Sequence, residues 1–245
     1  MTLQIAIAGF GGRMGQEIRR MADADPEVQV VAGIVRHRRE SQDGIVLATS
    51  VAELPEETGA IIDFSVPGAT LDIAHGAAER GIPLVIGTTG IRDADVKILR
   101  ELSRQIPIWY ARNMSYGVAV MHELLQQAAR QLAGYDIELV EMHHRNKVDA
   151  PSGTALALAE TLQREVPGSE ITTGRSGASK RADREIGIQS LRGGGNFGEH
   201  TVIFASDDEE IRIGHRALSR SVFASGAIRA AKRIAGTAPG WYGPE

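Results

Sequence analysis

The fold is decided by residues 5–15, which read IAIAGFGGRMG. The first four residues form a short apolar run, and a run of this kind that ends at a glycine is typical of a buried strand in a parallel sheet. After the glycines, Ile18 and Met21 recur at helical spacing among the polar residues of segment 15–24. These residues therefore predict a buried strand, a glycine-rich turn and an amphipathic helix.

The alternation of strands and helices continues to about residue 113. Apolar runs that predict strands occupy residues 28–35, 60–65, 83–87 and 108–111. Helical patterns occupy residues 71–80, which end at Gly81, and residues 93–105. Strands that alternate with helices at this spacing predict an α/β protein with a doubly wound parallel sheet.

The pattern changes after this point, which predicts a second domain. A helix is expected over residues 118–132 and another from Gly153, whereas strand-like runs occupy residues 135–142, 186–191, 201–205 and 211–213. Strands in succession with few helices predict an α+β domain with a mostly antiparallel or mixed sheet. Residues 168–184 are polar and are expected to form a mobile loop. Because residues 223–235 are again helical, we expect a first domain of residues 1–113, rejoined by about 217–245, and a second of residues 114–216.

Composition narrows the class of protein. With 42% hydrophobic and 24% charged residues, the chain of 245 residues has the composition of an ordinary soluble globular protein. The net charge of −4 argues against a nucleic-acid partner and gives no support for a membrane partner. The absence of cysteine excludes disulfides, thiolate nucleophiles and zinc–thiolate sites. Since neither a signal peptide nor a membrane-spanning run is evident, we expect a cytoplasmic protein.

The glycine turn, residues 9–15, is a candidate dinucleotide site. It departs from the pattern G-x-G-x-x-G at its last position, because Gly15 rather than residue 14 follows in the helix. The context is nevertheless right, with a buried strand before the turn and a helix after it. Glycines there let a pyrophosphate approach the helix N-terminus, and the alternative is a plain strand–helix turn.

The end of the second strand predicts which dinucleotide is preferred. NAD sites commonly have an acidic residue there, whereas this chain has Val35 followed by Arg36, His37, Arg38 and Arg39. Guanidinium groups bind a 2′-phosphate well, so we expect NADPH to be preferred, with NADH possible. The alternative is a solvated basic loop.

Polar or glycine-rich segments follow three later strands. These are residues 64–67, 87–90 and 112–115. Ligands collect at the carboxyl ends of parallel strands, so together the segments predict a nicotinamide pocket. Each alone reads as a turn.

A second candidate site lies at the end of the run 135–142. His143, His144, Arg145 and Lys147 follow one another closely, and Glu141 could orient a histidine. If the strand continued, His143, Arg145 and Lys147 would share one face and His144 would lie on the other. A zinc site is not favoured, because no third ligand stands at a useful distance in the sequence.

The helix that follows begins with an expected N-cap. Ser152 comes after Pro151, and the amides of Gly153 and Thr154 could bind an anion. The alternative is an N-cap that serves only the helix. Beside Lys147 and Arg145, a carboxylate-binding role is favoured.

With these motifs in place, the chain resembles the dihydrodipicolinate reductase family, now called 4-hydroxy-tetrahydrodipicolinate reductase, over nearly its whole length. The resemblance is carried by the glycine turn, by residues 87–89 and 113–115, by EMHHRNKVDAPSGTA at 141–155, and by RGG at 192–194 with GEHT at 198–201. It implies an N-terminal Rossmann domain and a substrate domain whose sheet builds a homotetramer. It also implies NAD(P)H-dependent reduction of 4-hydroxy-tetrahydrodipicolinate, a small cyclic dicarboxylate, in the diaminopimelate route to lysine.

The resemblance also implies residue roles. His143 would donate and accept the proton, Lys147 would donate a proton, and His144, Gly153 and Thr154 would bind substrate. The implied cofactor-binding residues are Gly9, Phe10, Gly11, Gly12, Arg13, Met14, Arg36, Gly87, Thr88, Thr89, Arg112, Asn113, Met114 and Ser115, and no metal is expected. Val35 stands where many members have an acidic residue, which puts ready use of NADH in doubt.

Two other functions are consistent with parts of the sequence. One is an NADP-dependent aldehyde or amino-acid dehydrogenase of similar plan, although its acyl-transfer versions need a cysteine. The other is a dinucleotide-sensing regulator, which would explain the glycine turn but not the polar residues 143–147.

Overall fold

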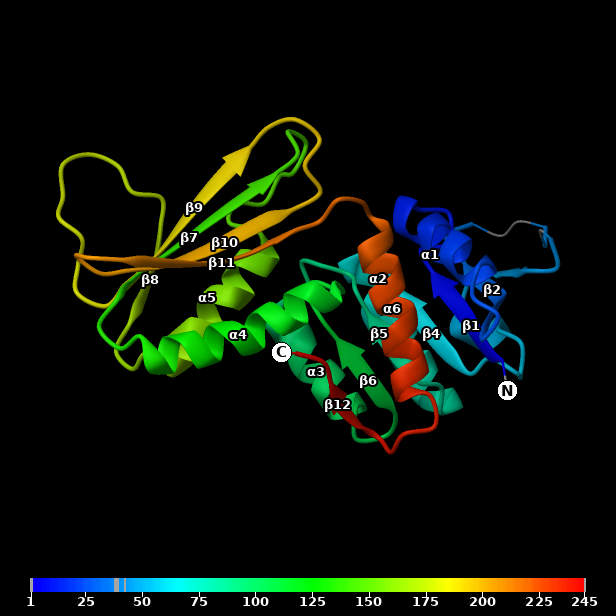
Figure 1. Cartoon of the computed structure of the whole chain (residues 1–245). Coiled ribbons are helices and arrows are strands. Elements are labelled where there is room, and N and C mark those ends of the chain that lie inside the picture. Colours follow the sequence, from blue (N-terminus) through cyan, green and yellow to red (C-terminus); the bar gives the residue numbers. More distant parts are fainter. Residues whose placement is uncertain (1, 38–39, 42, 245) are drawn as a thin grey trace. The chain divides into compact units, whose positions relative to one another are not determined.

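The chain divides into two units. The computed structural model describes residues 2–37, 40–41 and 43–244. One unit is made of Met1–Met114 and Arg220–Glu245, and the other of Ser115–Ser219. Each contains its own sheet (Figure 1). No helix in the described ranges has the length and apolar character needed to cross a membrane.

Seven strands form the sheet of the first unit, and all neighbours in it are parallel. Their order is β12-β6-β5-β4-β1-β2-β3, so the chain leaves β1 toward β2 on one side and returns to β4 on the other. Doubly wound sheets bind ligands at such a reversal of strand order. The strands are β1 (Leu3–Ala8), β2 (Val28–Ile34), β3 (Val46–Ala48), β4 (Ala60–Asp63), β5 (Leu84–Ile86), β6 (Pro107–Tyr110) and β12 (Gly240–Tyr242).

Helices cover both faces of this sheet because its central strands are apolar on both sides. In β1, Ile5 and Ile7 pack in the core that includes α1 and α6, whereas Ala6 and Ala8 pack in the core that includes α2 and α3. The predicted doubly wound parallel sheet is confirmed. The helices are α1 (Arg13–Asp23), η1 (Val51–Glu53, a 3₁₀ helix), α2 (Pro67–Arg80), α3 (Asp93–Leu102) and α6 (Ser221–Ile234).

The sequence pattern misses short elements of this unit. Strands β3 and β12 have three residues each, which is too few to show a period. Helix α2 begins at Pro67 rather than at the predicted residue 71. Proline suits the first position of a helix because its φ is already helical and its missing N–H needs no partner there.

The second unit has a mixed sheet of five strands in the order β11-β10-β7-β9-β8. Strand β10 is antiparallel to both of its neighbours, but β7, β9 and β8 run parallel. The expected mixed sheet is confirmed, and α5 lies in the crossover connection that the parallel strands require. The elements are α4 (Tyr116–Gln131), β7 (Asp136–His143), α5 (Gly153–Glu165), β8 (Glu170–Thr173), β9 (Glu185–Arg192), β10 (Glu199–Ala205) and β11 (Glu210–Arg216).

The segment 168–184, expected to be a loop throughout, contains strand β8. Its residues pair in parallel with the start of β9. The segment is also held by Arg181, whose guanidinium lies 2.9 Å from the Asp136 carboxylate and contacts Glu138. Sequence patterning misses β8 because its four residues, mostly exposed at a sheet edge, show no apolar period.

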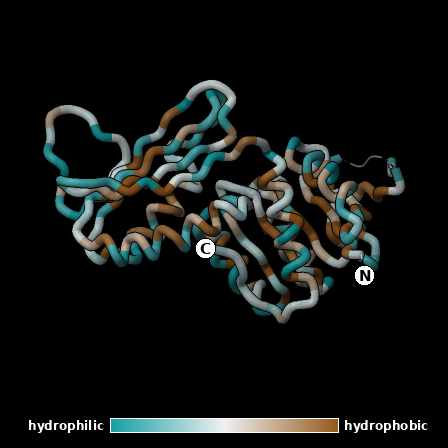
Figure 2. The backbone as a smooth tube through the Cα atoms, in the orientation of Figure 1, coloured by the Kyte–Doolittle hydropathy of each residue, from teal (hydrophilic) through white to brown (hydrophobic). Residues whose placement is uncertain are grey.

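Strand alternation gives the second sheet two different faces. The inner face carries Leu139, Ile188 and Val202, which pack on α4 and α5 in one core. The outer face carries Val140 and Ile203, and alternating hydrophilic and hydrophobic segments along these strands are visible in Figure 2. Residues at odd positions of β7, including Glu141 and His143, therefore lie on the helix-covered face.

Candidate active site

Strand β7 ends at His143, so the strand does not continue to Lys147. The chain turns at His144, whose amide donates to the carbonyl of Asn196 at 2.8 Å. The Lys147 amide then donates to the His144 carbonyl at 3.1 Å and closes a turn. Arg145 and Lys147 consequently do not follow His143 along one strand face. The Asn196 carbonyl that ends the strand belongs to the loop between β9 and β10.

Glu141 and His143 lie side by side on the inner face of the sheet. Their spacing of two residues on a strand puts both side chains on the same side. Nδ1 of His143 lies 2.6 Å from Oε2 of Glu141. Glu141 has no exposed surface and His143 is 8% exposed. The structure thus brings the predicted proton-transfer residue against a buried carboxylate.

Arg192, at the end of β9, holds the same carboxylate. It stands opposite His143 in the parallel register. Its Nη1 and Nη2 each donate at 2.8 Å, to Oε2 and Oε1 of Glu141 respectively. The amide of Ser152 donates to Oε1 at 3.1 Å. Burial opposes ionisation of Glu141, but the hydrogen bonds from His143 and Arg192 outweigh it and hold the pKa of this carboxyl well below its usual range.

A second buried histidine, His200, faces this pair from β10. It stands opposite Glu141 in the antiparallel register, and its ring meets the His143 ring edge-on with centroids 5.2 Å apart. Its Nε2 lies 3.1 Å from Oγ of Ser152. Burial, and next the neighbouring His143, lower the pKa of His200 to about 3, so its ring is neutral near pH 7.

The predicted N-cap of α5 is confirmed. Oγ of Ser152 accepts a hydrogen bond from the Ala155 amide at 3.1 Å. Gly153 and Thr154 form the first turn of the helix, and the side chain of Thr154 is buried. Helix N-termini attract anions, so the position suits the expected carboxylate contact.

Lys147 is held by Asp149 in the segment between β7 and α5. Its Nζ lies 2.8 Å from Oδ1 of Asp149, and its side chain is 22% exposed. Burial opposes ionisation of Asp149, but its hydrogen bond with Lys147 and that charge lower the pKa of the carboxyl. Nη2 of Arg192 also donates to the Asp149 carbonyl at 2.6 Å. Arg192 thereby connects the Glu141 carboxylate with the segment that carries Lys147.

Sequence reasoning missed Arg192 and His200 as members of this cluster. Both lie in the family-like motifs at 192–194 and 198–201, but neither motif is close to residue 143 in the sequence. Only the register of β7 with β9 and β10 places them there. The signals available in the sequence were these two motifs and the charge of an arginine beside three glycines.

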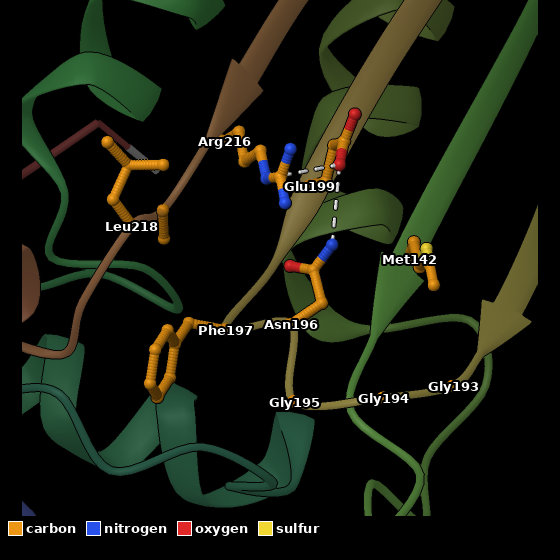
Figure 3. Close-up of a pocket in the computed structure, with 10 residues that line it drawn as sticks. Met142, Gly193, Gly194, Gly195, Asn196, Phe197, Glu199, Arg216 and Leu218 are labelled. Atoms are coloured by element: carbon orange, nitrogen blue, oxygen red, sulfur yellow. Dashed lines mark hydrogen bonds and ion pairs between the residues drawn. The ribbon is translucent and has the colours of Figure 1, made fainter.

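A cavity of about 530 Å³ lies at the same end of the second sheet (Figure 3). Glu199 stands between Arg216 Nε, at 3.6 Å, and Asn196 Nδ2, at 3.3 Å. None of the predicted substrate or proton-transfer residues lines this cavity, because Glu199 and Met142 belong to the outer face and His143 to the inner. Its lining is Met142, Gly193, Gly194, Gly195, Asn196, Phe197, Glu199, Arg216, Ala217 and Leu218.

In the first unit, the glycine turn packs too closely for side chains. Gly9 has φ +76°, and a Cβ there would lie 2.4 Å from the carbonyl oxygen of Phe64. A Cβ on Gly15 would lie 2.4 Å from the Gly9 carbonyl oxygen, which explains why glycine stands at position 15. A Cβ on Gly11 would meet nothing within 4 Å, so the turn is open at that residue. Gly12 is the N-cap of α1, and Phe10, Arg13 and Met14 flank it.

The remaining predicted cofactor residues follow the strands as expected, with one exception. Gly87, Thr88 and Thr89 come directly after β5, and Arg112, Asn113 and Met114 after β6. Ser115 belongs to the second unit, where its Oγ lies 3.0 Å from Nε2 of His215. Arg36 is exposed after β2, whereas Arg38 and Arg39 lie outside the described residues.

Asp63 at the end of β4 is a residue that the sequence analysis did not single out. Its buried carboxylate accepts from the Ser65 amide at 2.8 Å and from Oγ1 of Thr70 at 2.7 Å. Burial raises the pKa of this carboxyl. These hydrogen bonds fix the turn that faces Gly9. Within the described residues, no group of three or more His, Cys, Asp or Glu side chains could hold a metal ion.

The buried His200 predicts a pH-dependent stability. Because its folded pKa of about 3 lies below the ordinary 6.5, protons bind the unfolded chain preferentially. The stabilisation is complete above about pH 6.5 and is lost as the pH falls toward 3. From pH 7 to pH 5 the wild-type protein should lose about 2 kcal/mol more unfolding free energy than His200→Gln.

Urea unfolding at the two pH values measures this difference. His75→Gln, at an exposed position on α2, serves as the control and should keep the wild-type pH dependence. Equal losses in wild type and His200→Gln would contradict a neutral, buried ring.

Comparisons with known proteins agree with this architecture. The family model "Dihydrodipicolinate reductase, N-terminus" matches residues 3–114, and "Dihydrodipicolinate reductase, C-terminus" matches residues 117–245. A 4-hydroxy-tetrahydrodipicolinate reductase of Caldanaerobacter subterraneus subsp. tengcongensis is 41% identical over 244 residues, which is 99% of this chain and 96% of that protein. One of Thermomicrobium roseum is 41% identical over 250 residues, covering 98% and 97%.

Solved structures give the same fold. Dipicolinate-bound dihydrodipicolinate reductase from Paenisporosarcina sp. TG-14 matches with a TM-score of 0.80 at 21% identity, covering 99% of this chain and 98% of that chain. An amine dehydrogenase from Mycobacterium smegmatis matches with a TM-score of 0.68 at 10% identity, covering 99% and 95%. At these identities the structures show the fold alone, whereas the family models span nearly the whole chain. The chain belongs to the dihydrodipicolinate reductase family, as its sequence motifs indicated.

Proposed function

We propose that this protein catalyses the NAD(P)H-dependent reduction of 4-hydroxy-tetrahydrodipicolinate to tetrahydrodipicolinate, with loss of water, in the diaminopimelate route to lysine. The observation that carries the proposal is the full-length similarity, about 40% identity, to proteins named for this activity. The cluster of Glu141, His143 and Arg192 beside the N-terminus of α5 supports it, because the reaction needs a proton donor next to an anion site.

The glycine turn fits a dinucleotide. Gly9 and Gly15 allow the close packing of turn and helix, Gly11 faces open space, and Gly12 precedes the N-terminus of α1. Residues 87–89 and 112–115 would contact the nicotinamide part. When bound, the reduced nicotinamide supplies the hydride.

The second unit would bind the substrate and handle its proton. Loss of water from the cyclic dicarboxylate gives a conjugated imine, and hydride addition at ring C4 moves negative charge toward the nitrogen. His143 would donate the proton required there, and Lys147 would stabilise the charge and serve as a second donor. Gly153 and Thr154 at the start of α5, with His144, would hold a substrate carboxylate.

The reductase assay tests this proposal. NADPH absorbance is followed with freshly generated 4-hydroxy-tetrahydrodipicolinate. His143→Ala should lower turnover by on the order of 10²-fold, because general acid catalysis is lost. Lys147→Ala should lower turnover and raise KM. Lys97→Ala, on the exposed side of α3, removes a similar charge and should leave both constants unchanged. Full activity in both site variants, or an inactive wild type, would refute the assignment.

We further propose a preference for NADPH over NADH. Arg36 is exposed two residues after the end of β2, and Val35 before it offers no carboxylate to the ribose 2′-hydroxyl. A guanidinium there would bind the 2′-phosphate. Arg36→Ala should weaken NADPH binding by on the order of 10-fold, since a charged hydrogen bond is lost, and should leave NADH binding unchanged. Calorimetric titration with each dinucleotide measures both affinities. An NADH preference that survives the substitution would rule the idea out.

We also propose that the protein is a homotetramer assembled through the outer face of the second sheet. No described helix of that unit packs on this face, which carries Val140, Met142, Leu191 and Ile203. Leu191 is half exposed. Apolar side chains on an uncovered sheet face suit an interface between copies related by symmetry.

Sedimentation analysis should give the mass of four chains for the wild type. Ile203→Arg should shift the protein to smaller species, because a charge would be buried in the interface. Leu124→Arg, at an exposed position of α4, is the matched control and should keep the wild-type mass. A monomeric wild type would contradict this assembly.

A further inference from the structure

The Glu141 carboxylate is saturated with donors. Oε2 accepts hydrogen bonds from Nδ1 of His143 and Nη1 of Arg192, at 2.6 and 2.8 Å. Oε1 receives Nη2 of Arg192 and the Ser152 amide, at 2.8 and 3.1 Å. An ionised carboxylate offers about four acceptor positions, and these four donors, together with the side chain of Ser190, use all of them. The group has no exposed surface.

This saturation determines which nitrogen of His143 carries its hydrogen. Oε2 is an acceptor only, so Nδ1 of His143 must be the donor in their contact. In the neutral ring the lone pair is therefore on Nε2. Nε2 is then the atom that takes up a proton and gives it away.

Arg192 extends the same arrangement to Lys147. Its guanidinium binds both oxygens of Glu141 and also the Asp149 carbonyl. The carboxylate of Asp149 in turn holds the Lys147 ammonium at 2.8 Å. The Arg192 guanidinium thus fixes both the Glu141 carboxylate and the segment that positions Lys147.

We propose that Glu141 and Arg192 are positioning residues for proton transfer: Glu141 holds His143 with Nε2 as the exchanging atom, and Arg192 holds Glu141 in register with the Lys147 segment. The inference rests on the proposed function and goes beyond it by assigning the proton to one atom and naming the residues that fix it there.

The other groups around His143 do not supply the same effect. His200 on β10 meets its ring edge-on and is neutral near pH 7, with its Nε2 directed to Ser152. His215 and Lys147 act electrostatically on His200. Glu141 is the anion in hydrogen-bond contact with His143, so its charge stabilises the imidazolium.

Glu141→Gln tests the proposal. The side-chain NH₂ would meet a donor in either orientation, because both oxygens of Glu141 receive two donors. Turnover should fall by on the order of 10-fold, and the alkaline limb of the turnover–pH profile should move down by about one pH unit, since the imidazolium loses its counter-charge. KM for NADPH should not change.

Glu138→Gln is the matched control. It lies on the same strand but on the outer face, where its carboxylate pairs with Arg181. It should keep the wild-type pH profile. A merely structural role for Glu141 would lower stability or activity at every pH without moving the limb, and that result would overturn the proposal.

Arg192→Lys tests whether one guanidinium must bind both the Glu141 carboxylate and the Asp149 carbonyl. Lysine keeps the charge but cannot bind both Glu141 oxygens and the Asp149 carbonyl. We expect lower turnover together with a higher KM for substrate, because the Lys147 segment is released. Unchanged kinetics would exclude Arg192 from this role.

Nitrogen NMR of wild-type protein with labelled histidine gives a readout that does not depend on activity. The neutral His143 ring, assigned by comparison with His143→Gln, should carry its hydrogen on Nδ1. A hydrogen on Nε2 would refute the positioning role. An inactive wild type with the expected tautomer would instead refute the proposed function alone.

Discussion

The second unit depends on one buried carboxylate being fully paired. Removing an ionised glutamate from water costs several kcal/mol unless hydrogen bonds and an opposite charge compensate. Glu141 obtains both, from a bidentate Arg192, from Ser152 and from His143. Each partner comes from a different place in the sheet or the helix start, so satisfying one carboxylate fixes the ends of β7 and β9 and the beginning of α5 together.

The same constraint connects stability with chemistry. A histidine whose one nitrogen is committed to a buried anion can exchange protons only through the other, and it is held in one orientation while it does so. The neighbouring His200 is kept neutral by burial and adds no competing charge near pH 7. Charges are therefore concentrated on the Glu141–Arg192 pair and on Lys147 with Asp149.

In the first unit, close backbone packing around the glycine turn, rather than charge pairing, restricts the residues that fit. The carbonyl of Phe64 approaches Gly9, and the carbonyl of Gly9 approaches Gly15, more closely than any side chain would allow. Asp63 fixes the approaching turn through Ser65 and Thr70. The common glycine fingerprint has its last glycine at residue 14, whereas here it is Gly15, because the helix packs against the turn at that residue. The turn remains open at Gly11.

The sequence by itself determined the alternation of the first sheet, the glycine turn, the N-cap at Ser152 and the family, because these depend on residues close to one another in the chain. It failed for β8, β3 and β12, which are too short to show a period, and it did not show which strands of the mixed second sheet run parallel. Only the tertiary structure decided that Arg192 and His200, 51 and 48 residues from their partners, meet Glu141 and Ser152. Strand register sets those contacts, and register arises from pairing and packing of whole strands, which no local spacing encodes.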